Sequence, residues 1–297
     1  MKKILAPPPS KGFTLIEMIV VMVITGIIGG MIAMFIRAPV QGYLDSARRA
    51  AMTDIADTAL RRISRDLRLA LPNSVRVATD GTNFYLEFIP TIGGGRYRVG
   101  PPGNELRFTD ATDTSFEVLG PTGVAASAND FLVIYNLGIA SSGACAALGA
   151  DAYEGCNRRA IVSGGNAITF TNTTLPFPFE SPGNRFHVFT APVTYVCAPV
   201  AGGGGTLTRY WGYPIQRLQS STDSIAELIA LVDPANAARG SALLADNVGA
   251  VGAGGCNFSY QANVVAERTG IVTMNLTVTQ GGESVTLYNV AHVSNEP

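Results

Sequence analysis

An apolar run close to the N-terminus constrains this chain more than any other feature. It extends from Phe13 to Ile36, and Glu17 is the only charged residue among its 24 residues. A helix rises about 1.5 Å per residue, so the run would span about 36 Å and cross a hydrocarbon core of about 30 Å. The sequence therefore predicts a membrane-spanning helix.

The residues that flank this run predict its orientation. Residues 1–12 contain Lys2, Lys3 and Lys11 and no acidic residue. Such positively charged flanks stay in the cytoplasm, so the chain beyond residue 36 is expected on the other side of the membrane. An ordinary secretory signal fits less well, because its apolar segment is about 7 to 15 residues long and precedes the cleavage site.

The start of the run carries a specific motif. The string KGFTLIE at 11–17 resembles the class III signal of type IV prepilins and pseudopilins, and the likeness covers residues 12–23. In that family a membrane aspartic peptidase cuts after the glycine, and the new N-terminal phenylalanine is N-methylated. The resemblance implies cleavage between Gly12 and Phe13, methylation of Phe13, and removal of residues 1–12 as a leader.

Glu17 has a functional and a structural interpretation. A carboxylate within a bilayer-spanning stretch is costly, and such residues are functional when a partner can be named. The resemblance names one, because the corresponding glutamate of the family meets the N-terminal amine of a neighbouring subunit during assembly. The structural alternative is that Glu17, one turn from the membrane edge, reaches toward the headgroups.

Helical periodicity continues over residues 37–71, which are predicted to form an amphipathic helix. Pro39 is expected to loosen or kink this helix, and Pro72 with Asn73 is expected to stop it. The arginines between 61 and 68 are interpreted as a solvated face of the helix rather than as a docking patch. The predicted apolar stripe, which a globular body must cover, consists of Leu44, Ala47, Ala51, Ile55, Ala59, Ile63, Leu67 and Leu71.

The remaining chain, 72–297, changes to short alternating runs between turn residues, which predict strands. The turn at 280–282 predicts a hairpin, and 224–232 predicts a short helix. The glycine runs 93–95 and 202–205 are interpreted as flexible loops, since they lack the lysine and hydroxyl residue of a phosphate loop. The predicted strands are 74–78, 84–89, 96–99, 115–119, 131–135, 167–171, 185–190, 194–197, 206–211, 270–279 and 283–290.

Four cysteines in an exported segment predict disulfides, because that compartment is oxidising. Three connectivities are possible. Cys145 and Cys156 flank a loop rich in Gly and Ala, while Cys197 ends a predicted strand and Cys256 follows a glycine-rich stretch. Local pairing therefore favours 145 with 156 and 197 with 256. A zinc site is disfavoured, because the cysteine spacings contain no CxxC pattern.

Charge and motif content argue against other functional classes. Lysine plus arginine (21) nearly cancels aspartate plus glutamate (22) without blocks of either sign, so no nucleic-acid footprint is visible. No GxSxG or HExxH motif occurs, and the two histidines, His187 and His292, are interpreted as structural. The chain is expected not to be an enzyme and to need no cofactor or metal.

The fold expected is α+β, with one long N-terminal helix packed on a strand-rich, pilin-like globular head. A head of about 225 residues is bulkier than a major pilin needs, which favours a minor subunit. Residues 57–68 and 270–297 are similar to larger minor subunits, including the J-type pseudopilins and minor pilins of the mannose-sensitive haemagglutinin (MSHA) pilus. The expected function is assembly or priming of an MSHA-type type IV pilus, with 13–36 as transmembrane and assembly helix.

The resemblance also implies partners and a location. The partners are other pilins of the filament, the prepilin peptidase and N-methyltransferase, the inner-membrane assembly platform and membrane lipid. The location is the inner membrane, with a cytoplasmic N-terminus, a periplasmic head, and entry into the extracellular pilus on assembly. Two alternatives stay open: a type II secretion minor pseudopilin, and a membrane-anchored periplasmic binding protein or adhesin that keeps residues 1–12 and tolerates Glu17→Ala.

Overall fold

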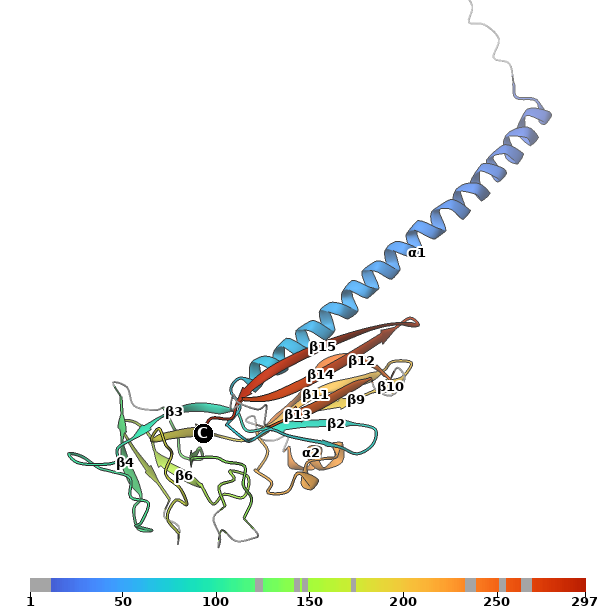
Figure 1. Ribbon diagram of the computed structural model, residues 1–297. Helices are drawn as coiled ribbons and strands as arrows, with labels where there is room; N and C mark the ends of the chain where they lie inside the picture. The colour runs from blue at the N-terminus through green and yellow to red at the C-terminus, as the bar shows by residue number, and fades with distance from the viewer. Residues whose placement is uncertain are drawn as a thin grey trace, which may run out of the picture. The chain divides into compact units, whose positions relative to one another are not determined.

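The computed structural model describes residues 12–120, 125–141, 145, 149–171, 175–232, 239–250, 255–262 and 269–297. The chain divides into two compact units, Met1–Ala50 and Ala51–Pro297. The boundary falls within the long helix α1 (Leu15–Leu67), which is drawn in blue in Figure 1. The long N-terminal helix and strand-rich head confirm the predicted α+β class.

The first part of α1, residues 15–36, is apolar on every side apart from Glu17. Each described side chain from Gly12 to Leu44 is exposed. Among the described residues, α1 is the one helix long and apolar enough to cross a membrane. Pro39, where a loosening or kink was expected, lies inside a helix that continues without interruption. A helix that is apolar all round needs a lipid or protein environment.

In the second unit, α1 buries one side of its last five turns. The predicted stripe shares Ala59, Ile63 and Leu67 with the observed one, but it wrongly placed Ala51 inside, where the side chain is exposed. Four residues turn a helix by about 400°, so a row of steps of four drifts by about 40° at each step. The observed stripe stays on one side of the helix because it includes steps of three residues as well as steps of four. It consists of Met52, Ala56, Ala59, Leu60, Ile63 and Leu67.

The helix ends at Leu67, earlier than the predicted end at Leu71. The N–H of Leu71 donates to the carbonyl of Ile89 at 2.7 Å, and an isolated bridge joins Ala70 to Pro90. These contacts use backbone groups that another helical turn would need. A partner distant in sequence therefore stops the helix before Pro72 does.

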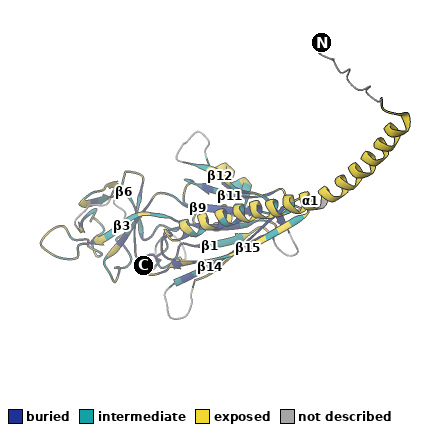
Figure 2. Ribbon diagram, turned by 90° about the horizontal axis from the view of Figure 1, so that it is seen from above, coloured by how far each residue is buried: buried dark blue, intermediate teal, exposed yellow. Residues whose placement is uncertain are grey.

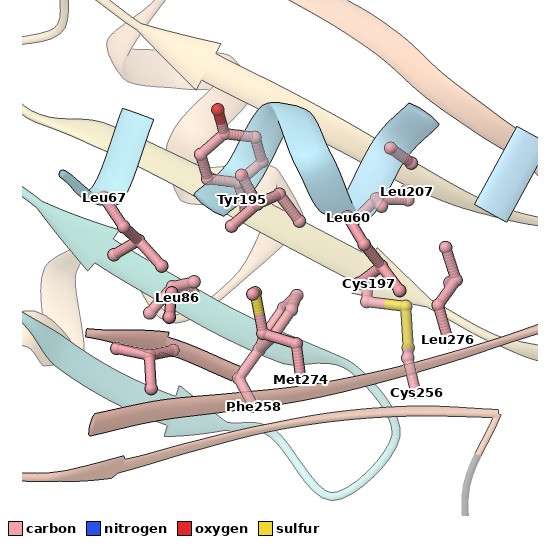
Figure 3. Packing of buried hydrophobic residues seen from close by; sticks show 14 of the residues in the cluster. Leu60, Leu67, Leu86, Tyr195, Cys197, Leu207, Cys256, Phe258, Met274 and Leu276 are labelled. Carbon is pink, nitrogen blue, oxygen red and sulfur yellow. A yellow bond between two sulfur atoms is a disulfide. The ribbon is translucent and has the colours of Figure 1, made fainter. Parts of the chain in front are cut away.

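The stripe of α1 packs on a nine-stranded sheet in the described part of the chain. The order is β1-β2-β9-β11-β12-β14-β13, with β10 on β12 and β15 on β14, and every pair except β10–β12 is antiparallel. Figure 3 shows Leu60 and Leu67 over Leu86 and Met274 in this core. The strands are β1 (Arg76–Thr79), β2 (Phe84–Phe88), β9 (Val193–Ala198), β10 (Val200–Ala201), β11 (Gly205–Trp211), β12 (Gly240–Ala250), β13 (Cys256–Gln261), β14 (Thr269–Gln280) and β15 (Glu283–Ser294).

Six further strands close into an antiparallel barrel with its own apolar core. Phe116 and Phe186 meet edge to face in it, with ring centroids 5.2 Å apart. The barrel and the sheet both belong to the second compact unit. The barrel order is β3 (Thr91–Tyr97), β4 (Ser115–Leu119), β7 (Ala167–Phe170), β6 (Arg158–Ser163), β5 (Phe131–Ile134) and β8 (Arg185–Phe189).

One of the two glycine runs expected to be flexible loops is part of a strand. Residues 93–95 lie in β3 and pair with β8. A Cβ added at Gly94 would lie 2.8 Å from the carbonyl oxygen of Phe186, so the two strands approach too closely for any larger residue. The second run, 202–205, contains a turn but ends in β11, because Gly205 is the first residue of that strand.

The predicted hairpin and short helix are both present. The hairpin joins β14 to β15 through Gly281 and Gly282, whose φ angles of 61° and 82° are those of a type I′ turn. The helix α2 (Ile225–Leu231) begins after Ser224, whose hydroxyl accepts the N–H of Glu227. A single 3₁₀ turn, η1 (Gln219–Ser221), precedes it.

Candidate functional site

The expected processing point lies immediately before α1. Gly12 and Phe13 precede the first helical residue, and the side chain of Phe13 is 77% exposed. Among the described residues, no atom lies within 4 Å of a Cβ built on Gly12, so the described chain does not crowd this glycine. The rest of the expected leader, residues 1–11, lies outside the described residues.

Glu17 forms a capping box with Thr14 at the start of α1. Its carboxylate Oε2 accepts both the backbone N–H and the hydroxyl of Thr14, each at 3.3 Å, and its own N–H donates to the Thr14 hydroxyl at 3.3 Å. The reciprocal bonds satisfy backbone donors that have no partner within the helix. Sequence reasoning missed this arrangement, although a threonine followed three residues later by a glutamate is its known signature.

The capping box gives the Glu17 carboxylate a local role as well as a possible partner between chains. A negative charge in the first helical turn interacts favourably with the helix dipole. Only Oε2 is engaged by Thr14 among the described residues, so Oε1 is available to a second donor. The structure thus fixes where the carboxylate lies at the start of α1.

The apolar surface after Glu17 is suited to packing against lipid or other helices. The hydroxyl of Thr25 donates to the carbonyls of Val21 at 2.6 Å and Met22 at 3.1 Å, so this polar group is satisfied within the helix. Among the described residues, no atom lies within 4 Å of a Cβ built on Gly26 or Gly29. Small residues of this kind allow close approach of helices in membranes.

The four cysteines form the two disulfides that local pairing favoured. Cys145 pairs with Cys156, and Cys197 pairs with Cys256, with Cα atoms 5.2 Å and 6.4 Å apart. Cys197 and Cys256 are fully buried in the core under α1, where Figure 3 shows their bond. This bond joins β9 to β13, two strands that do not pair with each other. Both disulfides are structural elements of the head.

A polar cluster attaches the end of α1 to the sheet. Asp66 Oδ2 accepts the Tyr195 hydroxyl at 2.6 Å and Arg209 Nε at 3.1 Å, and its Oδ1 lies 3.2 Å from Arg62 Nε. Burial raises the pKa of Tyr195, and the hydrogen bond to Asp66 raises it further. The phenol therefore stays neutral and donates. The cluster orients the end of the helix on the head.

The two histidines predicted to be structural lie at separate places in the head. His187 is in β8, where burial and then the charge of Arg185 lower its pKa. His292 is in β15, exposed beside α1. Among the described residues, no group of three or more His, Cys, Asp or Glu side chains is placed to hold a metal ion.

Comparison with known families bears on the N-terminal segment. Residues 8–34 match the family described as the prokaryotic N-terminal methylation motif. The chain carries this motif. Neither a curated protein nor a solved structure matches the chain. The motif supports a type IV pilin-like or pseudopilin-like protein, and it implies processing by prepilin peptidase and association with other pilins. The apolar helix within it is consistent with membrane anchoring.

Proposed function

We propose that the chain is a minor pilin-like subunit that takes part in assembling or priming a type IV pilus of the MSHA kind, in a role like that of MshO. Its role is structural, without catalysis. The observation that carries the proposal is the methylation motif at 8–34 leading into a helix that is apolar on every side. The large head with a barrel beside its sheet favours a subunit present in few copies over the bulk building block.

The mechanism proposed is release from the membrane by helix packing. Cleavage between Gly12 and Phe13 creates an α-amino group next to the capping box. The helix then leaves lipid for a bundle of pilin helices, where burial would make the unpaired carboxylate of Glu17 costly. The methylated amine of a neighbouring subunit neutralises that carboxylate through the free oxygen. The head is periplasmic before assembly and lies on the filament afterwards.

Mass spectrometry of the N-terminal peptide from membrane-extracted protein tests the first step. We expect a mature chain that starts at N-methylated Phe13. An intact Met1 in cells whose prepilin peptidase is active would contradict the proposal. That result would instead favour a plain membrane anchor that carries a periplasmic binding protein or adhesin.

Three substitutions separate the charge of Glu17 from its capping role. Glu17→Ala removes both, and Glu17→Gln removes the charge but keeps a side chain that can complete a capping box. Thr14→Ala removes the cap, at about 1 kcal/mol of helix stability, but keeps the carboxylate. We expect both Glu17 variants to be processed but excluded from filaments, and Thr14→Ala to be incorporated. Wild-type incorporation of Glu17→Gln would contradict the charge-pairing mechanism.

The type II secretion pseudopilin shares every N-terminal feature described above. Co-purification separates the two assignments, because the chain cross-links either to pilus subunits or to pseudopilins. Cross-links to subunits of an MSHA-type pilus are expected. Cross-links confined to a secretion pseudopilus would replace the pilus assignment and leave the processing mechanism intact.

A further inference from the structure

β15 is an open edge of the nine-stranded sheet. Its twelve residues pair with β14 in an unbroken register, from Gln280↔Glu283 to Thr269↔Ser294. Among the described residues no strand pairs with its other side. The strand has no proline or bulge, and Glu283 is its only formally charged residue. Proteins usually protect long edges with such devices, so an edge without them is suited to pairing with another chain.

The hairpin geometry identifies which backbone groups of β15 are free. A two-residue type I′ turn is closed by a hydrogen-bonded pair, here Gln280 and Glu283, and bonded pairs then alternate along the ladder. Odd-numbered residues of β15 therefore bond to β14. Even-numbered residues, including Val290 and His292, direct their N–H and C=O groups away from β14, toward the open side.

A groove of about 510 Å³ lies between this edge and α1. Residues 289–292 of β15 form one wall, and helix residues between Asp57 and Arg68 form the other. The hydroxyl of Ser64 donates to Asn289 Oδ1 at 3.1 Å and joins the two walls. Figures 1 and 2 both show β15 beside this part of α1.

The helical wall of the groove is positively charged. Arg61, Arg65 and Arg68 line it together with a single carboxylate, that of Asp57. Asp57 is bound to Arg61 at 2.5 Å. Arg65 and Arg68 are exposed, and neither forms an ion pair with an acidic residue of the described chain. The groove thus combines free strand-pairing groups with two uncompensated cations.

We propose that this groove binds an extended acidic segment of a partner protein, which adds to β15 as a further strand. Strand addition supplies the backbone bonds, and side chains at alternate positions supply specificity. Alternate residues of a strand lie about 6.8 Å apart, and Arg65 and Arg68, at the end of α1, lie about 4.5 Å apart along the helix axis. Because arginine side chains are long and flexible, two alternate carboxylates of the added strand reach both of them. This surface lies at the C-terminal end of α1, apart from the apolar segment 13–36 on which the assembly mechanism rests, so the inference goes beyond the proposed function.

Binding of a fluorescent peptide to the full chain in detergent micelles tests the proposal. The probe has eight residues that alternate glutamate and threonine, and fluorescence anisotropy measures its affinity. A second peptide replaces glutamate by lysine. A third keeps the sequence of the first but carries a methyl group on every peptide nitrogen, which removes the N–H donors that strand pairing needs on both edges. We expect the first peptide to bind at least tenfold more tightly than either of the others.

Matched variants assign this binding to the groove. The double substitution Arg65→Glu with Arg68→Glu is expected to weaken the acidic peptide at least tenfold. Arg96→Glu is the control, because Arg96 is an exposed arginine of β3 in the barrel. Val290→Pro removes an N–H on the open edge without removing a bond to β14. Its affinity for the acidic peptide is also expected to fall at least tenfold. Far-UV circular dichroism verifies that each variant is folded.

Three results would overturn the proposal. Equal affinity for the glutamate–threonine peptide and its N-methylated form would mean that the arginines bind anions without strand pairing. Unchanged affinity in the double arginine variant would place binding elsewhere. Binding of phosphatidylglycerol vesicles through Arg65 and Arg68, without binding of the acidic peptide, would assign the surface to a membrane.

Discussion

Replacing Glu87 by alanine tests the buried ion pair of the head. Glu87 is fully buried in β2, where Oε1 accepts Arg76 Nη2 at 2.8 Å and Oε2 accepts the Thr222 hydroxyl at 2.6 Å. Arg76 also lies over the ring of Tyr153, 3.5 Å from its centroid, and its side chain is 17% exposed. The substitution would leave this guanidinium largely buried without its counter-ion.

The expected decrease in the free energy of unfolding follows from the contacts that Arg76 keeps. Removing one partner of a buried ion pair costs about 3–5 kcal/mol. Arg76 keeps its bonds to the carbonyls of Gln216 and Arg217, at 3.0 Å and 3.1 Å, so about 3 kcal/mol is expected for Glu87→Ala. Glu87→Gln keeps the acceptor but loses the charge. Its cost should be about 1–2 kcal/mol, because bonds to charged groups contribute more than neutral ones.

Urea unfolding of the full chain in detergent measures these losses. The single tryptophan, Trp211, lies in β11 and reports on the head. With a slope of about 3 kcal/mol/M, Glu87→Ala should lower the midpoint by about 1 M. Glu117→Ala is the control, because its salt bridge to Arg98 is partly exposed and should contribute less than about 1 kcal/mol.

A double variant provides the sharpest test of the reasoning. Arg76→Met combined with Glu87→Leu removes both charges, so it should be more stable than Glu87→Ala alone. Two outcomes would refute the argument. One is a Glu87→Ala midpoint indistinguishable from that of the Glu117→Ala control. The other is a double variant no more stable than the single one.

Two further predictions concern the head. Replacing Cys197 and Cys256 by serine should lower the free energy of unfolding by about 4 kcal/mol, because their bond closes a loop of 59 residues. Replacing Cys145 and Cys156 by serine should lower it by about 3 kcal/mol, because that loop spans 11 residues. Equal shifts of the urea midpoint would contradict the dependence on loop length. Partial burial opposes ionisation of Asp80, but bonds from neighbouring N–H groups outweigh it and lower its pKa well below the usual value. The contribution of the Asp80 carboxylate to the free energy of unfolding should therefore be complete above about pH 4 and fall as the pH drops further. The difference in unfolding free energy between the wild type and Asp80→Asn should then become smaller on acidification. A difference that grows would be evidence against this assignment.

Short sequence patterns correctly predicted the elements whose structure depends on residues nearby in the chain. The paired glycines 281 and 282 specify a type I′ turn wherever they occur between strands, and the hairpin formed as predicted. The helix α2 likewise begins at the serine cap that precedes it. The capping box of Thr14 and Glu17 was equally readable, but both interpretations of Glu17, a partner in assembly and the lipid headgroups, lie outside the chain, so its contact with Thr14 was missed.

Strands that depend on distant partners were missed. β12 was not predicted, since its sequence, GSALLADNVGA, has no strict alternation, yet it pairs with β11 along most of its length. β6, β10 and β13 were also not predicted. The glycines of β3 have weak strand preference, but pairing with β8 makes their lack of a side chain a requirement.

Apolar runs, short motifs and the order of the cysteines were enough to predict the apolar helix, the processing motif within it, the hairpin and the disulfide pairing. The first three depend on residues close together in the chain, and the disulfides on pairing each cysteine with the next one in the sequence. The tertiary structure alone decided the division of strands between sheet and barrel, the end of α1 at Leu67, and the pairing of Arg76 with Glu87. These depend on contacts between distant segments, whose free energy appears only when the chain is folded and local periodicity cannot encode it.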